Sequence, residues 1–230
     1  MRISDTTETQ DHTNTLASID CNRGEKPEEK VKLQVIRQLM DSGKLYAALA
    51  NLDAIAVHSP QETYLRAEIL RQTGRSEVAI PLYKQLTKGC AAGYAYHGLG
   101  LISGKSGNIN EALDFLSQAR MKLPTNIDVR NDLGYAMFLS GQYEPARHEF
   151  LTALELDEKN EFSASNLVLL LLVTDQYDKA QSLAVRKKIS GATFKELVAK
   201  ATEIREATEL QKPGADRSEQ ATAMKKTNTK

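Results

Sequence analysis

The segment GLGLISGKSG contains the residues that most directly suggest chemistry. Gly104-Lys105-Ser106 could end a phosphate-binding loop, in which a lysine and a hydroxyl group contact the phosphates of a nucleotide. Such a loop needs four residues between its two glycines. Gly100 and Gly104 enclose three residues, and Gly98 and Gly104 enclose five. No strand is predicted before the segment. The spacing therefore argues against nucleotide binding.

The sequence supports metal binding and nucleophilic catalysis no better than it supports nucleotide binding. His148 begins the segment HEFLT, which lacks the second histidine of a zinc-protease motif. The other histidines, His12, His58 and His97, have no spacing typical of metal ligands. Serine, aspartate and glutamate are common, but no arrangement indicates a nucleophile with its base. We expect no enzyme activity, no metal site and no cofactor.

Composition limits the function classes further. The chain of 230 residues is 41% hydrophobic and 26% charged, as in an ordinary globular protein, and its formal net charge is zero. A balanced charge argues against a nucleic-acid partner that is bound through general basicity. No run of 18 apolar residues occurs, so no transmembrane segment is expected. Cys21 and Cys90 are too few for a disulfide framework and leave the redox compartment open.

The two ends differ in composition from the middle. Residues 1–28 and 211–230 have few large apolar side chains, so both are predicted to be flexible tails around a domain at 29–210. The N-terminal tail has neither the hydrophobic core of a signal peptide nor the small apolar residues that a lipoprotein signal places before its cysteine. Location therefore stays open: a leader encoded upstream of Met1 favours the envelope, and a true start at Met1 favours the cytoplasm.

A repeat organises the residues between the tails. Gly43, Gly74, Gly107 and Gly141 recur at spacings of 31, 33 and 34 residues, and Asp175 follows after 34 more. An alanine stands five residues after each of these positions, and a further core residue stands four residues after the alanine. The alanines are Ala48, Ala79, Ala112, Ala146 and Ala180, and the following residues are Leu52, Tyr83, Leu116, Phe150 and Ala184.

This spacing resembles the tetratricopeptide repeat (TPR), which has two helices, A and B, in about 34 residues. The resemblance implies an all-α, right-handed solenoid of about five helix-turn-helix units with a C-terminal capping helix. Gly107 and Gly141 are expected in the turns between helices A and B, and Gly100 and Gly134 at the close crossing of the two helices. The capping helix is predicted at 193–210, opened by a capping box from Thr193 to Glu196.

The TPR resemblance also implies a function. In the family, the A helices line a concave face that binds a protein or peptide segment. Carried onto this chain by position, the expected groove residues are Tyr94, His97, Leu101, Asn131, Asp132, Tyr135, Phe138, Leu139, Phe162, Asn166, Leu169 and Leu172. The Lys and Asn residues with which chaperone-binding members hold a terminal carboxylate are absent: Arg37, Tyr64, Glu68 and Gly98 are among the residues found there.

The segment LVLLLLV, residues 167–173, allows two interpretations. A helix that is apolar nearly all round must be covered on more than one side. Either the 193–210 helix or a tail covers Leu169, Leu172 and Val173, or these residues form a hydrophobic groove for a partner.

Four segments are similar to a narrower family. HGLGL (97–101), RNDLGYA (130–136), FLTALEL (150–156) and SNLVLLLL (165–172) resemble TadD, the TPR protein of the tight-adherence, or Flp pilus, assembly system of bacteria. The likeness covers about residues 40–190 and implies a scaffold at the periplasmic face of the outer membrane. The missing lipoprotein signal departs from that pattern. The alternative is a cytoplasmic TPR adaptor or regulator that binds a soluble partner.

Overall fold

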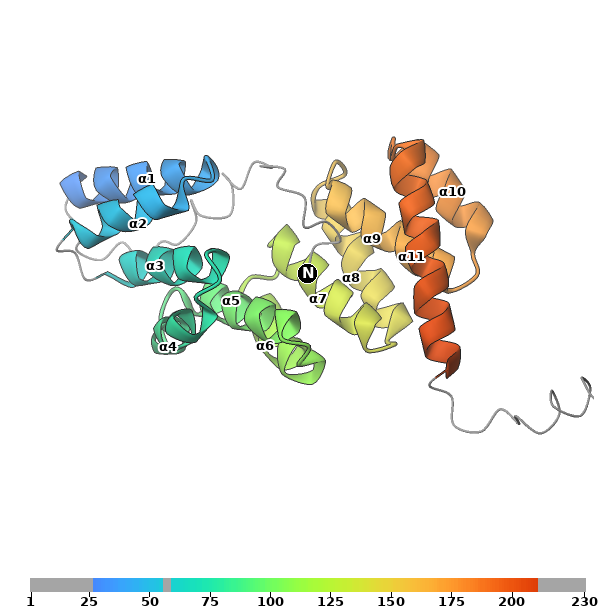
Figure 1. Ribbon diagram of the computed structural model, residues 1–230, viewed down its shortest axis with the longest axis horizontal. Helices are drawn as coiled ribbons and strands as arrows, with labels where there is room; N and C mark the ends of the chain where they lie inside the picture. The colour runs from blue at the N-terminus through green and yellow to red at the C-terminus, as the bar shows by residue number, and fades with distance from the viewer. Residues whose placement is uncertain (1–26, 56–58, 211–230) are drawn as a thin grey trace, which may run out of the picture. The chain divides into compact units, whose positions relative to one another are not determined.

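The described part of the chain is helical throughout. The computed structural model describes residues 27–55 and 59–210, and these residues form eleven α-helices and no strand (Figure 1). The expected tails lie outside these ranges, apart from residues 27 and 28. Among the described helices, none combines the length and apolar character needed to cross a lipid bilayer. The predicted all-α fold class is confirmed.

Successive helices form the predicted pairs. The A helices are α1 (Pro27–Asp41), α3 (Pro60–Gln72), α5 (Ala92–Lys105), α7 (Ile127–Leu139) and α9 (Glu161–Val173). The B helices are α2 (Leu45–Asp53), α4 (Ser76–Leu86), α6 (Ile109–Lys122), α8 (Tyr143–Leu156) and α10 (Tyr177–Arg186), and a single helix, α11 (Gly191–Leu210), follows. From α1 to α8, each A helix packs against its own B helix, and neighbouring A helices also touch.

The A-to-B turns have the backbone that the repeat predicts. Gly43, Gly74, Gly107 and Gly141 have φ angles of 71°, 81°, 80° and 78°, and Asp175 has 57°. This left-handed region suits glycine, and aspartate tolerates it better than most residues do. At Gly141, the amide donates to Phe138 O at 3.0 Å, and the next amide donates to Met137 O at 2.9 Å. This pair of bonds ends helix A and lets the chain reverse into helix B.

Helices A and B approach each other where helix A lacks a side chain. A Cβ atom at Gly134 would lie 2.8 Å from Phe150 Cε1, and one at Gly100 would lie 2.6 Å from Leu116 Cγ. Both large residues are at the core position that follows the repeat alanine by four residues, and both are buried. The glycines therefore admit the large B-helix side chains, as the sequence predicts.

Helix α3 begins with a serine cap and a proline, whereas the start of the last helix differs from the prediction. Ser59 Oγ accepts a hydrogen bond from the Glu62 amide at 3.1 Å, and Pro60 is the first residue of α3. The predicted start of the last helix at Thr193 is wrong, because α11 begins at Gly191. Ser190 Oγ accepts from the Thr193 amide at 3.1 Å, so Ser190 is the cap.

A buried charge network joins α3 to α4. Glu68 accepts hydrogen bonds from Arg71, from Gln72 Nε2 at 2.8 Å and from Tyr83 Oη at 2.6 Å. Burial alone would raise the pKa of Glu68, but the adjacent Arg71 guanidinium and the three donors lower it to about 2. The same arrangement raises the pKa of Arg71 above its ordinary value, against the effect of burial. Glu68 is therefore ionised, although little of it meets solvent.

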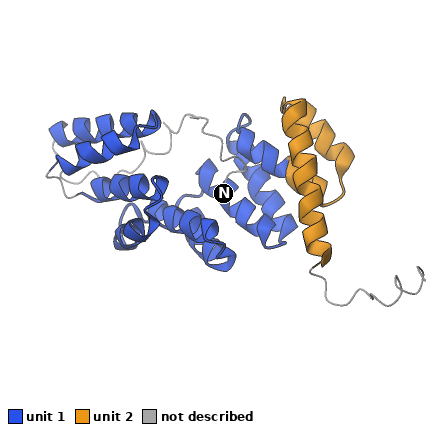
Figure 2. Cartoon of the chain, in the orientation of Figure 1, with its two compact units in different colours: residues 1–167 blue, residues 168–230 orange. Residues whose placement is uncertain are grey.

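The chain divides into two compact units, residues 1–167 and 168–230, and the division falls within α9 (Figure 2). In the second unit, Tyr177 of α10 and Phe194 of α11 form an edge-to-face pair with centroids 5.9 Å apart, and Arg205 pairs with Asp175. In α11, Leu197 and Ala201 are buried.

Replacing Gly134 by leucine is expected to destabilise the fold. The new side chain must displace Phe150 and meet the main chain of α8, so we expect Gly134→Leu to lower the free energy of unfolding by roughly 1–3 kcal/mol. Gly191→Leu is the control, because nothing lies within 4 Å of a Cβ atom at Gly191. Chemical denaturation measures both. Equal stability of the two variants would contradict a close crossing at Gly134.

Glu68 is expected to make stability depend on acid pH. Its pKa falls from 4.5 to about 2 in the folded protein, so the folded state binds the proton less well than the unfolded state. The advantage of wild type over Glu68→Gln in urea denaturation should be complete above about pH 5 and shrink as pH falls from 4.5 towards 2. An advantage that stays constant over this range would contradict the ionised, buried Glu68.

Candidate functional site

Five polar side chains connect three successive A helices within the first unit. His97 Nε2 of α5 lies 2.7 Å from Asp132 Oδ2 of α7. Asn131 Oδ1 accepts from Asn166 Nδ2 at 2.8 Å and from Ser163 Oγ at 3.3 Å, both on α9. Asn131 Nδ2 lies 3.4 Å from Asp132 Oδ1. We call these five residues the amide–carboxylate cluster.

The repeat itself brings these residues together. Asp132 follows His97 by 35 residues, and Asn166 follows Asn131 by 35 residues, so each contact joins nearly equivalent positions of neighbouring units. Since neighbouring A helices lie side by side, equivalent positions face one another along the stack. Each repeat therefore adds one polar contact between neighbouring A helices, and we call this series of contacts a polar ladder.

The cluster is recessed and negatively charged. The Asp132 side chain is 9% exposed and that of His97 is 12% exposed. Burial alone would raise the pKa of Asp132. Nearby positive charge and hydrogen bonds outweigh burial and hold this pKa below its ordinary value, and His97 contributes to both effects. Asp132 is thus a carboxylate at neutral pH. Asn166 Oδ1 is also buried and has no hydrogen-bond partner.

Aromatic side chains lie on the same helices. Tyr135 stacks on Phe138 with ring centroids 6.0 Å apart, and Phe138 lies 5.8 Å from Tyr143. Tyr94 of α5 lies 5.7 Å from Tyr64 of α3. In these contacts the expected groove aromatics pack against other side chains of the chain.

The predicted groove residues fall into three classes of exposure. Leu139 is exposed, at 41%. The half-buried ones are His97, Leu101 and Phe162. The buried ones are Tyr94, Asn131, Asp132, Tyr135, Phe138 and Asn166 in the first unit and Leu169 and Leu172 in the second. Partner binding by these residues stays a prediction.

The apolar segment of α9 is covered in the folded chain. Leu169, Leu172 and Val173 are each less than 9% exposed. This burial agrees with the interpretation in which the chain itself covers them. These three side chains do not present an open hydrophobic surface.

Sequence reasoning missed some polar residues. Ser163 belongs to the cluster, three residues before Asn166 and so about one helical turn away. Tyr83 Oη donates a buried hydrogen bond to Glu68, which the sequence analysis did not predict. The available signal was spacing: Tyr83 is a repeat-core residue, so any polar partner of its hydroxyl had to be buried as well.

The Gly104-Lys105-Ser106 segment does not form a phosphate-binding loop. Gly104 lies inside α5, Lys105 is the last residue of that helix, and Ser106 Oγ donates to Ile102 O. A phosphate-binding loop needs free amides that point at a ligand, but the Ser106 amide donates to Ile102 O and the Gly107 amide to Gly104 O. No group of side chains in the described residues could hold a metal ion.

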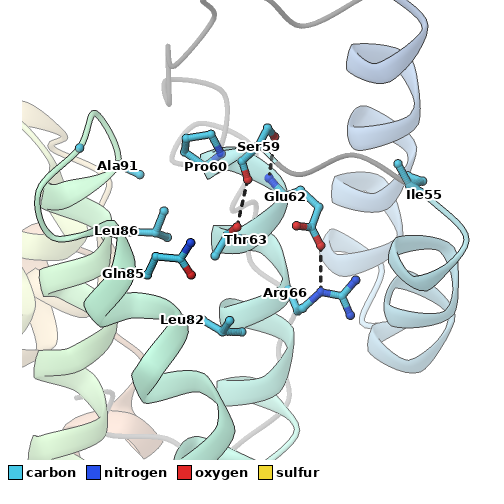
Figure 3. Close-up of a pocket in the computed structure, with 11 residues that line it drawn as sticks. Ile55, Ser59, Pro60, Glu62, Thr63, Arg66, Leu82, Gln85, Leu86 and Ala91 are labelled. Atoms are coloured by element: carbon cyan, nitrogen blue, oxygen red, sulfur yellow. Dashed lines mark hydrogen bonds and ion pairs between the residues drawn. The ribbon is translucent and has the colours of Figure 1, made fainter.

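A pocket of about 660 Å³ lies beside α3 and α4 (Figure 3). Its polar groups are paired with one another: Arg66 Nε donates to Glu62 Oε1 at 2.8 Å, and Thr63 Oγ1 donates to the Ser59 carbonyl at 3.1 Å. Leu82 and Leu86 form an apolar wall. With its charges already neutralised, this pocket offers less to a ligand than the amide–carboxylate cluster.

Phe138 and its neighbour Leu139 allow a direct test of which side chains support the fold. Phe138 is buried between two aromatic rings, so Phe138→Ala should lower the free energy of unfolding by about 3–5 kcal/mol. Leu139 is exposed, so Leu139→Ala should cost less than about 1 kcal/mol. Chemical denaturation compares the two. Similar losses would contradict this placement of α7.

Comparison with known proteins supports the repeat assignment. A family model described as tetratricopeptide repeat matches residues 105–167. The chain is 33% identical, over 182 residues, to the TPR repeat-containing protein PA4299 of Pseudomonas aeruginosa, and the match covers 79% of this chain and 74% of that protein.

Solved structures show the same fold at low identity. Pseudomonas aeruginosa pilF has 17% identity and a TM-score of 0.62, covering 78% of this chain and 85% of that one. Residues 41 to the end of MamA from Desulfovibrio magneticus RS-1 have 18% identity and a TM-score of 0.57, with coverages of 71% and 94%. TTC0263, a TPR protein of Thermus thermophilus, has 21% identity and a TM-score of 0.56, with coverages of 76% and 97%.

The period of the glycines and alanines and the paired helices are those of a tetratricopeptide repeat, and the curated relative is a TPR protein. The chain belongs to the tetratricopeptide repeat family.

Proposed function

We propose that the protein is an interaction scaffold that assists assembly of a bacterial Flp-type (tight adherence) pilus or of its secretion apparatus. The scaffold part follows from membership of a family of protein-interaction modules. The pilus part rests on the resemblance of HGLGL, RNDLGYA, FLTALEL and SNLVLLLL to TadD proteins.

The A helices are the proposed contact surface. The observation that carries this choice is the amide–carboxylate cluster, in which Asn131 joins an ionised Asp132 to Asn166, whose buried Oδ1 is unsatisfied. A chain that needed only a stable core would fill such positions with apolar side chains. Leu139, at the end of α7, adds an exposed apolar contact.

One observation supports an envelope location. Cys90, in the loop between α4 and α5, is disulfide-bonded, and the other cysteine of the chain, Cys21, lies outside the described residues. Disulfides persist in oxidising compartments such as the bacterial periplasm and are rare in the cytosol. A cytoplasmic adaptor for a soluble partner is the second candidate function, since the A-helix surface itself needs no envelope component in order to bind a protein.

Site-specific photocrosslinking in the source cell tests the proposal. A photoreactive residue at Leu139 of the full chain should crosslink to an envelope protein of the pilus secretion machinery. Leu151 is the matched control, since it lies on α8 and is 45% exposed against 41% for Leu139. It should give no such product.

Mass spectrometry identifies the crosslinked protein. A soluble cytoplasmic partner at Leu139 would replace the pilus proposal by the adaptor. Crosslinked products from Leu151 alone would place the contact surface on the B helices. That result would contradict an A-helix contact surface for the pilus scaffold and for the cytoplasmic adaptor.

A further inference from the structure

The pocket beside α3 and α4 is suited to apolar side chains. Leu82 and Leu86 project from α4 toward α3 and form one of its walls (Figure 3). Arg66 pairs with Glu62 at 2.8 Å and with Asp53 at 2.5 Å, so the charge of the guanidinium is already matched. A charged occupant would have to compete with these pairs, whereas an aliphatic side chain gains contact with the leucines and gives up no ion pair.

Cys90 stands at the edge of this pocket. Its two chain neighbours, Gly89 and Ala91, both line the pocket, and Cys90 itself is disulfide-bonded. The chain has two cysteines, so the partner of Cys90 within one molecule is Cys21. A disulfide holds the Cα atoms of its two cysteines within about 7 Å of each other. An intramolecular bond therefore brings the sequence around Cys21 to the rim of the pocket.

The residues before Cys21 can supply apolar side chains, and the residues directly after it cannot. Leu16 and Ile19 are the large aliphatic residues between Ser4 and Cys21. Residues 22–26, NRGEK, are polar or glycine and lead to the start of α1. An extended chain spans at most about 3.6 Å per residue, so Ile19 can reach about 7 Å and Leu16 about 18 Å from Cys21.

A covalent tether compensates for the small size of this segment. Two aliphatic side chains bury too little surface to bind a pocket from free solution, because association costs translational and rotational freedom. Attachment at the rim removes most of that cost, since a short tether gives an effective concentration in the millimolar range. The volume of the pocket, about 660 Å³, is in the range of cavities that hold small ligands.

We infer that the pocket beside α3 and α4 holds Leu16 and Ile19 of this chain, which a disulfide between Cys21 and Cys90 fixes at its rim. The pocket is then a docking site for the chain's own N-terminal segment, and it is open only when the disulfide is absent. The covalent loop from residue 21 to residue 90 encloses the first two helical pairs, α1 to α4. The inference goes beyond the proposed function, because none of these residues belongs to the amide–carboxylate cluster.

Peptide mapping tests the covalent part. The full chain is first equilibrated with oxidised glutathione and then digested with trypsin without reduction. Mass spectrometry should find residues 3–23 linked to residues 89–105, and the undigested protein should run as a monomer on a non-reducing gel. A link between two copies of peptide 89–105, or cysteines that stay free or capped by glutathione, would overturn the inference.

Methyl NMR on the full chain tests the docking. With isoleucine and leucine methyl groups labelled, the oxidised protein should show nuclear Overhauser effects from Ile19 to Leu82 and Leu86, and reduction should abolish them. Cys90→Ser, at an exposed position, should lose the same contacts and keep the helical circular dichroism spectrum. A disulfide without any such contact would overturn the inference, and contacts that persist in Cys90→Ser would contradict the tether.

Thermodynamic coupling gives an independent measurement. Docking and the disulfide stabilise each other by the same factor, so loss of docking makes the bond easier to reduce. Ile19→Ser should shift the dithiol–disulfide equilibrium in a glutathione buffer about fivefold toward the dithiol. Ile3→Ser, the same substitution elsewhere in the same segment of the chain, is the matched control and should cause no shift. Both positions lie outside the described helices, so neither change removes a described core side chain. An equal equilibrium for the two variants would contradict the docking of Ile19.

Discussion

The fold depends on the close approach of helix A to helix B at positions without a side chain. Gly134 admits the ring of Phe150, and Gly100 admits Leu116. These contacts set the spacing within each pair, and the left-handed turn at Gly141 or Gly107 brings the second helix back onto the first. Since the contact recurs in successive units, equivalent A-helix residues lie beside one another, and a polar ladder from His97 to Asn166 becomes possible.

Much of this fold could be predicted from the sequence because the same physical requirement is met once in every unit. A turn that needs positive φ recurs as Gly43 to Gly141, and Asp175 fills the fifth position with the same backbone. The start of α11 could not be fixed in this way. Ser190 and Thr193 are both hydroxyl residues that can cap a helix, and the choice between them depends on how the preceding turn packs.

The sequence predicted which residues lie at the candidate site, but it did not predict that they are buried. The period placed Asn131, Asp132 and Asn166 on the A helices, and the structure joins them. Their burial could not be foreseen, because exposure depends on packing between residues far apart in the sequence. The same reason explains Phe138, which lies against Tyr143 of the next helix instead of open solvent. An unsatisfied oxygen such as Asn166 Oδ1 becomes visible only when every neighbour has been placed.

Helix α5 contains four glycines in fourteen residues: Gly93, Gly98, Gly100 and Gly104. Each glycine costs a helix interior about 1 kcal/mol relative to alanine, so this segment has little tendency to be helical alone. Three of them meet side chains from elsewhere: Gly98 faces Tyr83 of α4, and Gly93 and Gly100 face Leu123 and Leu116. Helix α5 therefore forms only as its neighbours form. It makes the stabilities of adjacent repeats interdependent, so this part of the array should fold cooperatively and not one repeat at a time.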